Sequence, residues 1–117
     1  MADSQIESAL KGALQRGVAL TLVQENMSGR YTTILNTLKN DGANVSVYTS
    51  RTGYYIHAKE VLADYGTPRA QLFLGSENFS TSSLDDNREL GLIFNDPACM
   101  SAIQAALTAD YNNGQIL

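Results

Sequence analysis

A strand, a helix and a second strand in succession constrain the fold of this chain more than any other feature. Residues 18–23 form a short, apolar, partly β-branched run that is typical of a strand covered on both faces. Residues 44–49 have the pattern of a second strand. Between the two, apolar residues recur at helical spacing, with Ser28 placed to cap the helix and Asn40-Asp41-Gly42 to end it. This order favours parallel strands joined by a right-handed crossover, so the sequence predicts an α/β fold.

The remaining elements extend this prediction. A capping-box pattern at residues 4–7 opens a first helix over about residues 4–16. From residue 55 onward the strands are closely spaced, and we expect a hairpin and one more strand at 55–63, 70–74 and 89–94. Asp96-Pro97 is a good cap and first-turn pair for a last helix. Together the elements predict a mixed, mostly parallel sheet flanked by helices.

Length and composition indicate one ordinary globular domain over residues 1–117, with 44% apolar and 17% charged residues. No apolar run approaches the roughly 20 residues that cross a bilayer, and the N-terminus lacks a signal-peptide pattern. We therefore expect a soluble chain, whose compartment is left open. One cysteine and one histidine are too few for a zinc site, and Cys99 is interpreted as a small buried apolar residue.

Polar residues whose side chains can bind a ligand or take part in catalysis lie around the predicted strands after residue 55. His57 and Lys59 are two apart, so in a strand their side chains leave the same face about 6 to 7 Å apart and can reach one anion. Ser76 and Asn78 repeat this spacing just after a predicted strand end. Gly75, before them, lets the backbone turn or approach a ligand closely.

Glu89 opens the next predicted strand and could accept a hydrogen bond from one ring nitrogen of His57, which would fix the imidazole tautomer. A lone histidine in a strand is more often structural than catalytic, and Asp64 taken alone is typical of the start of a turn. The combination of these residues, rather than any one of them, indicates chemistry.

The combined pattern resembles the histidine–lysine–aspartate signature of the phospholipase D superfamily. The resemblance rests on His57-Ala58-Lys59, on Asp64, on Gly75-Ser76-Glu77-Asn78 and on Asn87-Arg88-Glu89, in that order. More diffusely, it covers most of the chain. This chain has ten residues between Asp64 and Gly75, more than the family usually has, which predicts a longer hairpin.

The resemblance implies a phospholipase D-like half domain and a role for each matched residue. His57 would be the nucleophile or the general acid at phosphorus, and Lys59 and Asn78 would hold the non-bridging oxygens of the phosphate. Ser76 would support the phosphate site, Glu89 would orient His57, and Asp64 would be a structural or supporting member of the catalytic set. No metal and no cofactor are implied.

The chemistry that the resemblance implies needs two histidines, one to form a phosphohistidine and one to protonate the leaving oxygen, and this chain has one. Either two copies pair in a homodimer, or the chain is half of a longer protein with two motifs, which we favour. In the second case, as the C-terminal half, His57 would be the acid.

The substrate class is left open by the motif, which suits phospholipids and nucleic acids alike. A net charge of −4, a pI near 4.7 and the absence of a basic stripe favour a phospholipid or another small phosphodiester. The expected activity is therefore that of a phosphodiester hydrolase or phosphatidyltransferase. An endonuclease and a non-catalytic binding module are the alternatives.

Overall fold

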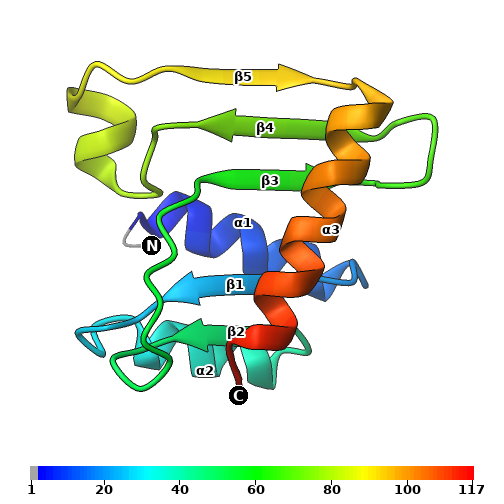
Figure 1. The fold of residues 1–117 in the computed structure, drawn as a ribbon. Helices are drawn as coiled ribbons and strands as arrows, with labels where there is room; N and C mark the ends of the chain where they lie inside the picture. Colours follow the sequence, from blue (N-terminus) through cyan, green and yellow to red (C-terminus); the bar gives the residue numbers. More distant parts are fainter. Residues whose placement is uncertain (1–2) are drawn as a thin grey trace. The chain divides into compact units, whose positions relative to one another are not determined.

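The computed structural model describes residues 3–117, which form two compact units: residues 3–57 with 110–117, and residues 58–109. Each unit has its own sheet, as Figure 1 shows, and each is described by itself. The helices and the two sheets confirm the α/β class. The expectation that residues 1–117 form a single domain stays a prediction.

The first unit contains the strand–helix–strand arrangement that the sequence predicts. Strands β1 (Thr21–Glu25) and β2 (Asn44–Tyr48) are parallel, and helix α2 (Thr32–Asn40) connects them. The short strand β6 (Gln115–Ile116) pairs antiparallel with the other side of β2, which makes this sheet mixed. Helix α1 (Ser4–Gln15) contacts α2, and α2 packs on β2.

The core of this unit is built around β2, because a central strand is covered on both of its faces. Four of its five residues are buried, and Leu35 and Leu38 of α2 are fully buried. The hydroxyl of Tyr48 donates a hydrogen bond of 2.8 Å to the backbone oxygen of Asp110. Burial first, and then the charge of Asp110, raise the pKa of Tyr48. The β2 strand is thereby tied to the end of helix α3 (Pro97–Asn113).

The second unit holds an antiparallel sheet in the order β3-β4-β5, formed by Glu60–Ala63, Gln71–Gly75 and Gly91–Phe94. A short π-helical turn, η1 (Ser82–Asp86), lies in the connection between β4 and β5. The predicted hairpin and third strand are therefore confirmed. Residues of α3 cover the sheet and complete a core made of Leu62, Ala70, Leu72, Leu74, Phe94, Met100 and Ile103.

Two helix starts differ from the sequence prediction. Asp3, not Ser4, caps α1, because its extended backbone lets its carboxylate accept from the N–H groups of Gln5 and Ile6 at 2.9 and 3.1 Å. Ser28 does not cap α2. Gly29 has a φ of 72°, which is incompatible with a helix continuing from Ser28, and α2 begins only at Thr32.

The prediction that Cys99 is buried was wrong, because its side chain is exposed. Cys99 lies in the first turn of α3, where its N–H donates 2.8 Å to the Asp96 carboxylate that caps the helix. The neighbouring Met100 faces the core in its place. The cap at Asp96 is confirmed. No helix within residues 3–117, α3 included, is long and apolar enough to cross a membrane.

Replacing Leu72 by alanine tests the core of the second unit. Leu72 is 0% exposed, so we expect the free energy of unfolding to fall by about 2–5 kcal/mol through lost burial and the cavity left behind. Urea unfolding followed by circular dichroism measures the loss. Leu92 of the same sheet is 61% exposed, and Leu92→Ala is the control, with an expected change within about 0.5 kcal/mol. Equal losses in both variants would contradict this assignment of the core.

Candidate active site

The carboxylate of Glu89 is the centre of a hydrogen-bonded cluster in the second unit. Its Oε2 accepts from the hydroxyl of Ser76 at 2.6 Å, and its Oε1 accepts from Ser83 at 2.5 Å and from the Asn87 amide at 3.3 Å. These donors stabilise the ionised carboxylate, so the pKa of Glu89 is lowered, with Ser76 as the largest cause. Glu89 is therefore held as an anion in a defined orientation.

The strands and the β4–β5 connection bring these donors together. Ser76 follows the last residue of β4 and continues the ladder, because its N–H donates to the oxygen of Leu90 at 3.0 Å and its Oγ accepts from the N–H of Leu90 at 3.2 Å. Ser83 comes from η1 and is 3% exposed. Its Oγ also accepts from the N–H of Asn78 at 2.9 Å. The connection thus folds back onto the strand ends, with Asn78 tied into the cluster.

Lys59 lies beside this cluster, just before β3. Its backbone oxygen accepts from the N–H of Gly75 at 3.1 Å, which places it opposite the end of β4. Partial burial lowers the pKa of Lys59, and the negative charge of Glu89 acts in the opposite direction. The second unit therefore brings together four of the predicted residues, namely Lys59, Ser76, Asn78 and Glu89.

His57 is the last residue of the first unit before the chain passes into the second. Its ring is exposed and stacks on Tyr55, with centroids 5.5 Å apart and planes inclined by 24°. The sequence predicts a strand from residue 55, but β3 begins only at Glu60. The reason is that β4 ends at Gly75 and offers no pairing partner to the residues before Lys59. Orientation of His57 by Glu89 stays a prediction.

Asp64 does not join the cluster. It ends β3 in a turn with a φ of 52°, and its backbone oxygen accepts from the N–H and the hydroxyl of Thr67 at 3.1 and 2.8 Å. Asp64 lies five positions after Lys59, which is roughly 16 Å along an extended strand. The structure therefore favours the structural alternative for Asp64, as the residue that turns the chain toward β4.

Two members of the cluster were not singled out as site residues from the sequence. Asn87 lies within the matched motif, but the sequence did not indicate that its side-chain amide donates to Glu89. Ser83 stands in a run of serines and threonines, and no local pattern distinguishes it from its neighbours. Its burial and its bond to Glu89 depend on how η1 folds back onto the strands, so no signal in the sequence could have identified it.

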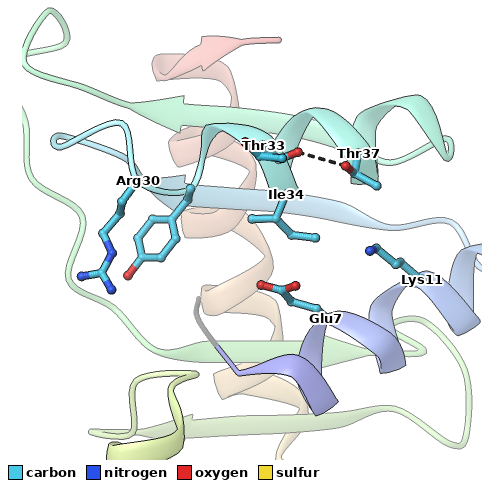
Figure 2. Close-up of a pocket in the computed structure, with 7 residues that line it drawn as sticks. Glu7, Lys11, Arg30, Thr33, Ile34 and Thr37 are labelled. Atoms are coloured by element: carbon cyan, nitrogen blue, oxygen red, sulfur yellow. Dashed lines mark hydrogen bonds between the residues drawn. The ribbon is translucent and has the colours of Figure 1, made fainter.

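A cavity in the first unit contains none of the predicted site residues. It measures about 470 Å³ and lies between α1 and α2, where Figure 2 shows Glu7 and Lys11 of α1 facing Ile34 of α2. Thr37 donates to the backbone oxygen of Thr33 at 3.0 Å along its rim. Glu7, Lys11, Arg30, Tyr31, Thr33, Ile34 and Thr37 line it. Nothing in it matches the chemistry around Glu89.

Replacing Ser76 by alanine tests the cause of the lowered pKa of Glu89. We expect the pKa to rise toward its ordinary value of 4.5, because the largest stabilising hydrogen bond is removed. A carboxyl with a lowered folded-state pKa adds stability above its unfolded pKa and loses it as pH falls through the folded pKa. In Ser76→Ala the free energy of unfolding should therefore fall less as the pH is lowered through the pKa of Glu89. Carbon NMR titration of the glutamate carboxyls measures the pKa.

Ser82→Ala is the matched control, because Ser82 is exposed in the same connection and makes no hydrogen bond to Glu89. An unchanged Glu89 pKa in Ser76→Ala, or an equal rise in Ser82→Ala, would contradict the assigned cause.

Comparison with known proteins agrees with the motif. Residues 1–111 match a family model described as "Cardiolipin synthase, PLD-like domain". Among solved structures, the fold matches Nuc, a phospholipase D family member from Salmonella typhimurium, with a TM-score of 0.83 and 23% sequence identity over 100% of this chain and 76% of that chain. A search of the curated proteins finds no match. Because the family model spans nearly the whole chain, this chain belongs to the phospholipase D superfamily, as a PLD-like domain of the cardiolipin synthase type.

Proposed function

We propose that this chain is one catalytic half of a phosphodiesterase that acts through a phosphohistidine intermediate, as a hydrolase or a phosphatidyltransferase. The observation that carries the proposal is the cluster around Glu89, with a partly buried cation at Lys59 beside it and the backbone of Asn78 held by Ser83. Phosphoryl transfer places negative charge on the non-bridging oxygens, and fixed donors beside those oxygens stabilise it. Lys59 and Asn78 supply such donors.

In the proposed reaction a histidine nitrogen attacks phosphorus, and an N–P bond forms as the P–O bond to the leaving group breaks. A second histidine donates a proton to the leaving oxygen. Water, or an alcohol in a transfer reaction, then gives up a proton to that second histidine as it attacks phosphorus and displaces the first. His57, two residues before Lys59, takes one of these roles. Glu89 is the proposed partner that orients its ring.

The three hydrogen bonds to Glu89 support this role, because they keep the carboxylate ionised and fixed in place. An ionised carboxylate holds an imidazole in one tautomer and stabilises the imidazolium that forms during proton transfer. The partial burial of Lys59 adds to the effect, since an ammonium in a less polar environment attracts an anion more strongly.

A second motif has to complete the site, because the chain has a single histidine. A homodimer or a further half domain would supply the other one. For the substrate, a net charge of −4 and a pI near 4.7 support a phospholipid over nucleic acid, which would favour a basic surface. The description of the matched family supports the same choice. Comparing headgroup release from vesicles with cleavage of single-stranded DNA distinguishes the two.

His57→Ala and Lys59→Ala test the catalytic assignment with bis(p-nitrophenyl) phosphate. We expect each variant to lose about 100-fold or more in turnover, because one removes the nucleophile or acid and the other a cation at the phosphate. Arg69→Ala, an exposed residue in the turn after β3, is the control and should keep full turnover. Full turnover in His57→Ala would contradict the mechanism. A wild-type chain without turnover, alone or with a second motif, would support the non-catalytic alternative.

The need for a second motif predicts that turnover depends on assembly. If a homodimer completes the site, activity per chain should fall on dilution below the dimer dissociation constant, in step with the dimer fraction measured by analytical ultracentrifugation. An inactive monomer at every concentration would instead indicate a separate half domain as the partner. Constant activity per chain in a fully monomeric sample would refute the requirement for two motifs.

A further inference from the structure

Two glycines lie beside Lys59 in the sheet of the second unit. Gly75 at the end of β4 pairs with Gly91 at the start of β5, and Lys59 lies opposite Gly75 on the other side. A row of Lys59, Gly75 and Gly91 therefore crosses the sheet. Because neither glycine has a side chain, this part of the row is bare backbone, next to the residue proposed to hold phosphate.

The carboxylate of Glu77 occupies the space above these glycines. A Cβ atom added to Gly91 would lie 2.6 Å from Oε1 and 2.9 Å from Oε2 of Glu77, and one added to Gly75 would clash with the same carboxylate. Both would also meet the ring of Phe73, at 2.6 and 2.7 Å. Glycine at both positions leaves room for the carboxylate where it lies in this structure, so the sheet forms a cradle for it.

One oxygen of this carboxylate has no hydrogen-bond partner within residues 3–117. Oε2 of Glu77 is buried and accepts no hydrogen bond from any of the described residues. Glu89, the other carboxylate at this end of the sheet, accepts three hydrogen bonds and interacts with the charge of Lys59. A buried carboxylate oxygen without a donor is unfavourable, and a cationic N–H donor is the group that would satisfy it best.

We infer that Glu77 determines substrate specificity by binding a primary ammonium group of the substrate, so that the enzyme prefers phosphodiesters that carry such a group close to phosphorus. Asn78 follows Glu77 in the chain. Lys59 lies next to Gly75, one of the two glycines under the carboxylate of Glu77. Because both residues neighbour Glu77 in the sheet or in the chain, we expect the substituents of a phosphate held by them to approach its carboxylate. This inference rests on the proposed function, which supplies the phosphate-binding role of Lys59 and Asn78.

The chemistry of the carboxylate also predicts which cation it selects. A primary ammonium has N–H groups that can donate to Oε2, whereas a quaternary ammonium carries the same charge without a donor. Ethanolamine-type substituents should therefore bind better than choline-type ones, and uncharged substituents should bind least. Nucleic acid phosphodiesters, which carry no ammonium group, should gain nothing from Glu77.

Isothermal calorimetry with three soluble phosphodiesters tests the inference. Glycerophosphoethanolamine, glycerophosphocholine and glycerophosphoglycerol differ in the ammonium group and share the phosphodiester. All titrations use the full chain with His57→Ala, so that no ligand is consumed. With Glu77 intact we expect glycerophosphoethanolamine to bind about tenfold tighter than glycerophosphoglycerol, with glycerophosphocholine between them. In Glu77→Gln, which keeps the size of the side chain, we expect this ratio to fall to near one.

Glu77→Asp is the control for a folding defect, because it keeps the carboxylate charge and only shortens the side chain. Part of the preference for glycerophosphoethanolamine should remain in this variant. The inference would be overturned if Glu77→Gln left the affinity ratio unchanged. It would also be overturned if the chain with Glu77 intact showed no preference among the three ligands, or bound none of them. The proposed function is tested separately by turnover of bis(p-nitrophenyl) phosphate, which carries no ammonium. Turnover that depends on His57, together with an unchanged ratio, would reject the specificity role alone.

Discussion

The hydrogen bonds to the carboxylate of Glu89 hold the candidate site together. Ser76 comes from the end of β4, Ser83 from η1, and Asn87 from the segment just before Glu89. One ionised group thus joins three parts of the chain, and through Ser83 it also positions the backbone of Asn78. Loss of the carboxylate would leave the buried Ser83 hydroxyl without its acceptor, which costs more than the bond itself contributes.

Two carboxylates at the same end of the sheet have opposite surroundings. Glu89 is surrounded by donors, which lower its pKa and fix its direction. Glu77 lies over two glycines that the ring of Phe73 also covers, and one of its oxygens has no donor within the described part of the chain. A satisfied carboxylate can orient a neighbouring group, whereas an unsatisfied one gains most from a cation that arrives with a ligand. We therefore give the two residues different roles.

The two units have separate cores, and each serves a different part of the proposal. The fully buried Leu35 and Leu38 support the parallel strands of the first unit, at whose end the chain reaches His57. Leu72 and Met100 support the antiparallel sheet that carries Lys59 and the cluster around Glu89. Membership in the phospholipase D superfamily explains why the matched residues are spread over both units, since the family model spans residues 1–111.

The sequence by itself determined the α/β class, the order of the elements and the family, because periodicity, turn residues and motif spacing are local properties of the chain. It also predicted that Lys59, Ser76, Asn78 and Glu89 converge. Tertiary structure alone decided that Ser83 joins Ser76 in donating to Glu89, that Cys99 is exposed, and that Asp64 lies past the opposite end of β3 from Lys59. These outcomes depend on which strands pair and where each strand ends, and contacts between residues distant in the sequence decide both.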